Sequence, residues 1–145
     1  FSGIAWINEY CNKGSTWGSR TSGSYSFNAI GSSRTAANTA IFVGHELGHN
    51  MGSPHTHCYQ PAIDECYGDE ADCYSGALSC PAGGKGTIMS YCHLSGAGCG
   101  TNKSQFHPDV QDLIKSRLAT NSPSCIALYE EEPPPEISFF QNGFE

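Results

Sequence analysis

Residues 45–55 of the chain read HELGHNMGSPH, which matches the pattern H-E-x-x-H-x-x-G-x-x-H. On a helix, residues four apart lie about 40° apart around the axis and roughly 6 Å apart along it. His45 and His49 therefore share one face, and their two imidazoles can bind one metal ion. Glu46 lies about 100° round from His45, where a carboxylate can act on a water bound to that ion.

The second half of this motif predicts how a third ligand reaches the same ion. Gly52 can end the helix in a left-handed conformation, and Pro54 prevents the helix from restarting smoothly. The chain can then turn back and deliver His55. Three neutral nitrogens leave the fourth position of a tetrahedral zinc ion open for water, which is typical of catalytic sites, whereas a structural site has four protein ligands.

The eleven-residue pattern resembles the signature of the metzincin zinc endopeptidases, which also have a methionine-containing turn downstream. Residues 86–92 read GTIMSYC and match such a Met-turn. The resemblance implies that Met89 lies under the zinc site as a hydrophobic floor. Tyr91 follows two residues after the methionine, as in astacins and serralysins. This position implies an auxiliary role in which the hydroxyl ligates zinc or donates to the oxyanion, and a purely packing role is the alternative.

Residues 3–5, with Cys11 a few positions later, resemble the edge strand of the reprolysin-like (adamalysin-type) metzincins. In that family the strand lies antiparallel to bound peptide, so the resemblance implies that Gly3, Ile4 and Ala5 pair with an extended substrate. Reprolysin-like enzymes usually have aspartate directly after the third zinc histidine, and this chain has Thr56 there. The metzincin subfamily therefore stays open.

The resemblance implies a zinc endopeptidase that hydrolyses protein or peptide substrates with a metal-activated water and Glu46 as general base. Two alternatives remain open. One is a non-catalytic zinc- or peptide-binding fragment of a metalloprotease. The other is a disulfide-stapled structural module in which the histidines and the glutamate are only buried polar groups.

Composition narrows the class of protein. The 145 residues suffice for one domain with a core. The net charge of −7, with only 14% charged residues, argues against a nucleic-acid-binding protein, which needs a basic face. The sequence contains no run of 18 apolar residues, so we expect no membrane span. Eight cysteines among Gly- and Ser-rich loops predict disulfides and a secreted, extracellular protein, and we expect it to be a monomer.

The predicted fold class is α+β: a metzincin-like (zincin) catalytic domain, truncated at its N-terminus, with a loop-rich, disulfide-stapled C-terminal subdomain. We expect this partial peptidase domain to span residues 1–128 and an acidic, Pro-rich linker to span residues 129–145. The expected elements are a strand within residues 1–10, a loop at 12–24, a strand at 25–30, a core-buried helix at 34–51, an irregular region at 56–86 and a helix at 108–119.

Two glycines in the first helix, Gly44 and Gly48, are expected to pack against the sheet. Five acidic residues in the irregular region are expected to form a solvated loop, because they lack the spacing of a calcium-binding loop. A Ca²⁺ site is the alternative. These residues are Asp64, Glu65, Asp69, Glu70 and Asp72.

The resemblance also implies one disulfide, between Cys11 after the edge strand and Cys125 after the last helix. The other six cysteines lie between the third zinc histidine and the last helix, and they allow 15 pairings that the sequence does not separate. These six are Cys58, Cys66, Cys73, Cys80, Cys92 and Cys99.

Overall fold

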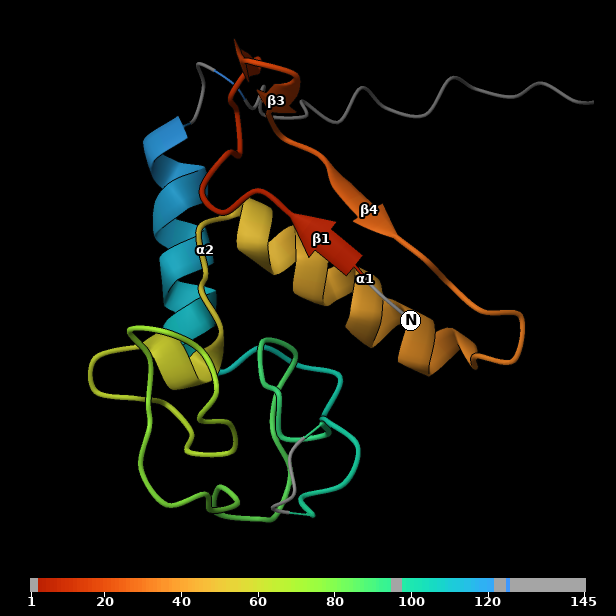
Figure 1. Cartoon of the computed structure of the whole chain (residues 1–145), viewed down its shortest axis with the longest axis vertical. Helices are drawn as coiled ribbons and strands as arrows, with labels where there is room; N and C mark the ends of the chain where they lie inside the picture. Colours follow the sequence, from red (N-terminus) through yellow and green to blue (C-terminus); the bar gives the residue numbers. More distant parts are fainter. Residues whose placement is uncertain (1–2, 95–97, 122–124, 126–145) are drawn as a thin grey trace, which may run out of the picture.

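The computed structural model of the chain describes residues 3–94, 98–121 and 125. Its elements in chain order are β1 (Gly3–Ala5), β2 (Ser15–Trp17), β3 (Arg20–Ser22), β4 (Ser26–Asn28), α1 (Ala36–Asn50), the 3₁₀ turn η1 (Thr56–Cys58) and α2 (Pro108–Asn121) (Figure 1). The linker expected at residues 129–145 lies outside the described residues. The described residues therefore form a small α+β arrangement of two helices and short strands.

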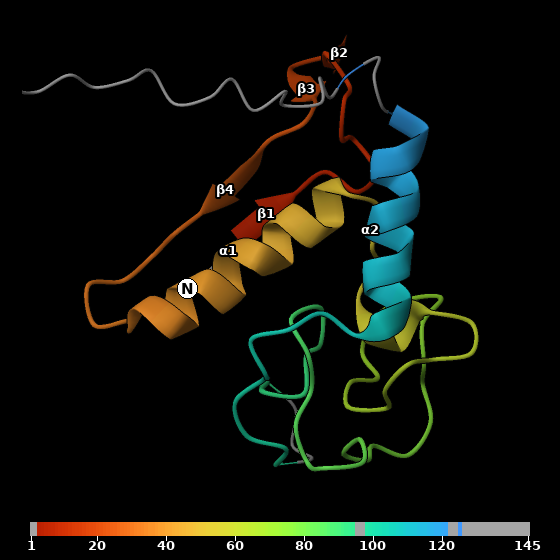
Figure 2. The same ribbon diagram turned by 180° about the vertical axis from the view of Figure 1, so that it is seen from behind.

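Strands β1 and β4 pair antiparallel and lie along α1 in both views (Figures 1 and 2). Ile4 faces Phe27 across the pair, and both side chains are well exposed, at 70% and 62%. The alternating residues, such as Gly3 and Ala5, are partly buried. This alternation is what a strand with one face toward a helix requires.

The prediction of a loop at residues 12–24 is wrong in part, because β2 and β3 form a second antiparallel pair there. Gly18 begins the two-residue turn between them with a φ of +61°, a conformation that glycine adopts without steric cost. The centroid of the Trp17 ring lies 6.1 Å from that of the Trp6 ring, so the β2–β3 pair lies beside the segment that follows β1.

Both ends of helix α1 are capped, so that free backbone N–H groups at its start and free carbonyls at its end have hydrogen-bond partners. The hydroxyl of Thr35 accepts a hydrogen bond from the Asn38 N–H at 3.2 Å and caps the N-terminus. At the other end Gly52 has a φ of +98°, its N–H donates to the His49 carbonyl, and the Ser53 N–H donates to the Gly48 carbonyl. These two bonds form a Schellman motif, which ends the helix directly before the third histidine.

The prediction that the first helix is buried in the core is wrong for its N-terminal half and for Leu47 in its C-terminal half. Ala37 and Ala40 are exposed, Leu47 is 49% exposed, and the buried residues are all in the last two turns. The packing expected for its glycines is also wrong. A β-carbon on Gly48 would collide with the Sδ atom of Met89, so the helix packs closely against the Met-turn rather than the sheet.

A small apolar core lies between α1, the Met-turn and α2. Its fully or nearly buried members are Ile88, Met89 and Val110, the last of these from α2. Partly buried side chains complete it: Ile41, Tyr59, Ile63, Phe106 and Ile114. Helix α2 thus reaches the floor of the histidine cluster through Val110.

The region between the two helices is a lobe of loops below them in Figure 1. Three disulfides hold it together: Cys58–Cys73, Cys66–Cys92 and Cys80–Cys99. A fourth joins Cys11 to Cys125, with Cα atoms 5.6 Å apart, and this is the pair that the resemblance implies. Within the described ranges, no helix is both long enough and apolar enough to cross a bilayer.

Candidate metal centre

The three histidines of the motif meet in space. His45 and His49 point from the last turns of α1, and the chain reversal at Gly52 brings His55 back to them. One ring nitrogen from each histidine lies within 4.8 Å of the others, and the ring centroids are 4.7 to 5.1 Å apart. The structure therefore brings together the residues that the sequence motif selects.

Each of the three imidazoles has its Nδ1 atom bound to a hydrogen-bond acceptor. His45 Nδ1 lies 2.7 Å from the carbonyl oxygen of Ile88, and His49 Nδ1 lies 2.8 Å from that of Ser53. His55 Nδ1 lies 2.7 Å from a carboxylate oxygen that belongs to a residue of the loop lobe. Because carbonyl and carboxylate oxygens only accept, each Nδ1 carries the ring proton and each Nε2 presents a lone pair.

The free lone pairs converge. His49 Nε2 and His55 Nε2 are 3.2 Å apart, a separation at which two lone pairs repel each other unless a cation lies between them. Fixing Nδ1 on a carbonyl or carboxylate is the usual outer-shell arrangement around metal-binding histidines. The donor set therefore fits a zinc ion on three imidazoles.

Burial keeps these imidazoles neutral at physiological pH. Burial lowers the pKa of His45 to about 3 and that of His55 to about 4, and it also lowers the pKa of His49. A histidine must be deprotonated at the nitrogen that binds a metal, so this environment favours ligation over protonation.

Glu46 lies beside the histidines with only 4% of its surface exposed. Burial raises the pKa of its carboxyl. The start of β1 lies directly against it, because a β-carbon on Gly3 would collide with the Glu46 carboxylate. The same strand that resembles a substrate-binding edge therefore begins at the candidate general base.

The Met-turn supports the cluster through its backbone as well as through its methionine. Met89 is fully buried against Gly48, which directly precedes His49 and lies about one helical turn after His45. The Met89 carbonyl accepts hydrogen bonds from the Thr56 N–H at 3.1 Å and from the Thr56 hydroxyl at 3.3 Å. Thr56, the residue that departs from the reprolysin-like pattern, thus attaches the chain directly after His55 to the Met-turn.

Tyr91 covers the other side of the cluster with its ring. The ring is stacked on His45 at 5.7 Å with an interplanar angle of 9°, and it lies 4.0 Å from the His55 ring. Burial, followed by the charges of Glu70 and Glu46, raises the pKa of the phenol to about 12. The hydroxyl therefore remains protonated near neutrality and can donate a hydrogen bond.

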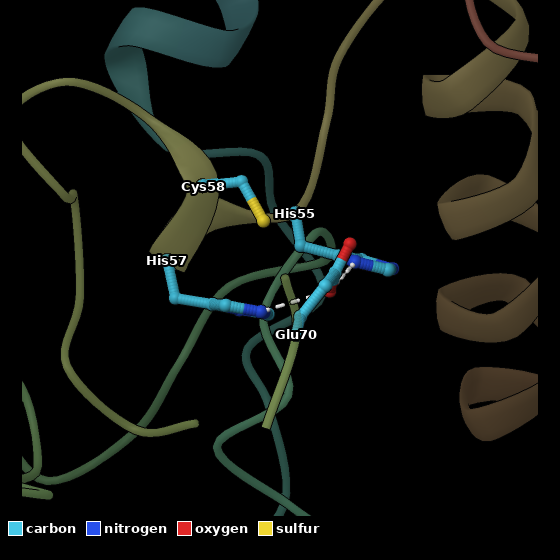
Figure 3. A group of neighbouring side chains, drawn as sticks. All are labelled: His55, His57, Cys58 and Glu70. Atoms are coloured by element: carbon cyan, nitrogen blue, oxygen red, sulfur yellow. Dashed lines mark hydrogen bonds and ion pairs between the residues drawn. The ribbon is translucent and has the colours of Figure 1, made fainter. Parts of the chain in front are cut away.

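Two further residues adjoin the site: Glu70, for which the sequence predicts only a solvated acidic loop or a Ca²⁺ site, and His57, for which it predicts no role. The carboxylate that accepts from His55 belongs to Glu70, and it also accepts from His57 Nε2 at 2.9 Å (Figure 3). Burial favours protonation of Glu70, but the hydrogen bonds and charges of the two histidines outweigh it and lower the pKa. The spacing His-x-His at residues 55–57 is the sequence signal that could have indicated His57.

A family model described as Metallo-peptidase family M12, of the reprolysin type, matches residues 2–106. The chain belongs to metallo-peptidase family M12. Comparison with curated proteins and comparison with solved structures each found no match.

Beside the histidines of this M12 chain lies a cavity of about 870 Å³. Its walls come from the start of β1, from α1 and the residues just before it, from the Met-turn and the segment after it, and from residues 100–102. Among the lining residues are His45 and Glu46, which places the candidate site at the cavity wall, and Tyr91, His93 and Leu94 from the segment that follows Met89.

Disulfides account for the cysteines in the two other clusters of potential metal ligands among the described residues of the M12 chain. Cys66, Cys92 and Cys99 lie together, and each is bonded to another cysteine. Cys58, next to His57, is bonded to Cys73. Of the five acidic residues considered for calcium, only Glu70 belongs to a metal-capable group within the described part of the chain, and its partners there are histidines and Cys58.

Proposed function

We propose that this M12 chain is a zinc-dependent endopeptidase that hydrolyses peptide bonds in protein or peptide substrates. One observation carries the proposal: three Nε2 lone pairs converge, and every Nδ1 is occupied by a fixed acceptor. Such a set of neutral nitrogens has little reason to assemble in a protein that does not bind a cation.

His45, His49 and His55 would hold the ion. Three imidazoles suit zinc and leave a fourth position for water or substrate. When bound, zinc polarises the attacking water and the scissile carbonyl. The acceptors on the Nδ1 atoms keep the three rings in one orientation, so the chain does not have to reorganise them during the reaction.

Glu46 is the proposed general base. Its carboxylate takes a proton from the attacking water and then gives that proton to the nitrogen of the leaving amine. Burial raises its pKa toward the working pH, where one group can both accept and return a proton efficiently. No covalent intermediate with the chain is needed.

The substrate would lie in an extended conformation along β1. Gly3, Ile4 and Ala5 would offer backbone donors and acceptors to it, as an edge strand does for an added peptide strand. Glycine at the first of these positions lets the strand approach the Glu46 carboxylate. A side chain of the substrate would enter the neighbouring cavity, whose wall includes Leu94 from the segment after the Met-turn.

The proposal extends to the domain and its location. We propose a metzincin-like (zincin) catalytic domain over residues 1–128, followed by a linker over residues 129–145. The family match over residues 2–106 and the motif, Met-turn and last helix in one order support this domain. Four disulfides are typical of proteins in an oxidising compartment, so we propose that the protein is secreted.

Replacing Glu46 with alanine tests the mechanism. We expect the purified Glu46→Ala chain to keep one zinc ion and to lose at least about 100-fold in kcat/KM on a denatured protein substrate, because general-base catalysis contributes about 10²- to 10⁴-fold. Zinc content is measured by elemental analysis, and cleavage is followed by gel electrophoresis and mass spectrometry. Glu65→Ala, which removes an exposed carboxylate of the loop lobe, is the matched control and should leave both quantities unchanged.

Two results would overturn this assignment. Cleavage by Glu46→Ala at the wild-type rate would show that Glu46 is not the base. A wild-type chain that binds zinc and an extended peptide without cleaving it would instead indicate a non-catalytic zinc- or peptide-binding protein.

A further inference from the structure

Glu70 connects two histidines through a single oxygen atom. Its Oε2 lies 2.7 Å from His55 Nδ1 and 2.9 Å from His57 Nε2, and Figure 3 shows the carboxylate between the two imidazoles. Of the three motif histidines, only His55 has an ionised side chain as its Nδ1 acceptor, because His45 and His49 use backbone carbonyls. The third histidine is therefore oriented by a group that a mutation can remove.

His57 fixes the position of that carboxylate. Its ring is fully buried and lies nearly parallel to the His55 ring, with 5.4 Å between centroids and 8° between planes. Its Nδ1 atom has no hydrogen-bond partner among the described residues, so the only polar contact of the ring is the one that Nε2 makes with Glu70. A buried imidazole with one partner orients that partner strongly, since losing the contact leaves both ring nitrogens unsatisfied.

The loop that carries Glu70 is tied covalently to the segment that carries the histidines. Cys58 follows His57 directly and is bonded to Cys73, three residues beyond Glu70. The Tyr74 N–H also donates to the His57 carbonyl at 2.9 Å. The disulfide and this hydrogen bond hold the carboxylate beside His55 although 15 residues separate them in the chain.

The distances argue against a second metal ion at this cluster. Separations of 2.7 and 2.9 Å between ring nitrogen and carboxylate oxygen are those of charge-assisted hydrogen bonds, with the protons on the nitrogens. The neighbouring Cys58 sulfur is already bonded to Cys73. The group therefore acts on His55 rather than on an ion of its own.

We propose that Glu70, held in place by His57, is a positioning residue for the zinc ligand His55. The carboxylate requires the proton on Nδ1 of His55, which leaves Nε2 as the metal-binding lone pair, and it makes that nitrogen a stronger donor to the metal. The inference rests on the proposed function, because it gives Glu70 a role only through zinc.

The test compares the zinc affinity of Glu70→Gln with that of Asp69→Asn, using chelator competition on the full chain. Asp69 is the exposed neighbour on the same loop, so its variant loses the same charge without touching the histidines. We expect zinc to bind about 10- to 100-fold more weakly to Glu70→Gln, as for other outer-shell carboxylates, and unchanged in Asp69→Asn. Glutamine keeps the size of the side chain but no longer requires a proton on Nδ1, because its amide can donate as well as accept.

A second measurement determines which ring nitrogen is protonated, and its first part uses only the wild-type chain, so it does not depend on how the variant folds. Nitrogen-15 spectra of the histidine side chains in the metal-free chain should show His55 protonated on Nδ1 and His57 protonated on Nε2. In Glu70→Gln the His55 signal should move toward a mixture of tautomers, while a role in stability alone would lower the melting temperature and leave this ratio unchanged.

The outcomes separate the two proposals. A wild-type chain that binds no zinc overturns the proposed function and this inference together. Two other outcomes overturn only the role of Glu70. In one, wild type binds zinc and Glu70→Gln binds it with equal affinity. In the other, wild type binds zinc but its metal-free form has His55 protonated on Nε2.

Discussion

His49 lies beside both other motif histidines, with its ring centroid 4.8 Å from that of His45 and 4.7 Å from that of His55. We expect the His49→Ala chain to lose the bound zinc, because two imidazoles alone hold the ion far more weakly than three. Elemental analysis of the dialysed protein measures this as a fall from one zinc per chain to near zero. His107→Ala removes a partly exposed histidine at the start of α2 and serves as the control. Equal zinc in His49→Ala and wild type would contradict the ligand assignment.

Tyr91 allows a test of its hydroxyl apart from its ring. If the hydroxyl donates to the developing oxyanion, Tyr91→Phe lowers kcat with little change in KM, because that interaction is made only in the transition state. Tyr67→Phe is the matched control, since its ring lies 5.1 Å from the Tyr91 ring. Steady-state kinetics on a short peptide provide both constants. Unchanged kinetics in Tyr91→Phe would leave only the packing role seen in the stacked ring.

The residues of the motif were predictable because their geometry is local. Helical periodicity alone places His45 and His49 on one face, and Gly52 indicates where the chain turns. The partner of His55 was not predictable, since Glu70 comes from a loop whose path depends on a disulfide that the sequence leaves open. From its sequence neighbours, Glu70 is one acidic residue among several.

Helix α1 contains two glycines that the structure distinguishes. We expect Gly48→Ala to destabilise the protein by about 1–3 kcal/mol, because the new methyl group overlaps Met89 and overpacks the core. Gly44→Ala should instead be neutral or stabilising by up to about 1 kcal/mol, since its methyl group would meet Ile88 at an ordinary 3.6 Å and alanine favours the helix.

Urea denaturation of the two variants measures this difference in the free energy of unfolding. Because both substitutions make the same chemical change on the same helix, helix propensity cancels in the comparison. Equal stabilities for Gly44→Ala and Gly48→Ala would show that the Met-turn is not packed against α1 as described.

At the level of elements, the sequence predicts best where the chain has a capping signal. Thr35 and Gly52 bracket α1 within two residues of the predicted ends, and Pro108 begins α2 as expected. The β2–β3 pair was missed because its short strands are mostly exposed, with only Ser22 buried, and lack an alternating apolar pattern. Burial of α1 was overestimated because apolar residues in a helix do not show whether another layer covers them.

Across the whole molecule, the Cys11–Cys125 disulfide closes the longest loop, with a sequence separation of 114. We expect the Cys11→Ala/Cys125→Ala double variant to lose about 4–5 kcal/mol of stability, as the chain-entropy model gives for a loop of this length. Thermal unfolding against wild type measures the loss. The Cys58→Ala/Cys73→Ala variant is a comparison for a short loop, with a separation of 15 and an expected loss of about 3 kcal/mol. A long-loop variant as stable as wild type would contradict the entropic argument.

The molecule as a whole was predictable in class but not in its loop lobe. The cysteine count and turn-rich composition indicate disulfides, and the resemblance implies the Cys11–Cys125 pair. The three other bridges depend on how residues 52–107 wind around one another, and no periodic pattern records that path. The structure shows the path of these loops, and one of the three bridges, Cys58–Cys73, holds the loop that carries Glu70 beside His55.

The Cys11–Cys125 bond also affects how damage to the protein becomes visible. With the proposed endopeptidase activity, the protein at high concentration can cut its own exposed loops. Any single cut between residues 11 and 125 leaves two pieces that this bond still joins, and the overlapping bridges from Cys58 to Cys99 join the pieces of the lobe again. Molecules that have been cut once would therefore migrate as full-length protein on a non-reducing gel, and only a reducing gel would reveal how much of a preparation is still intact.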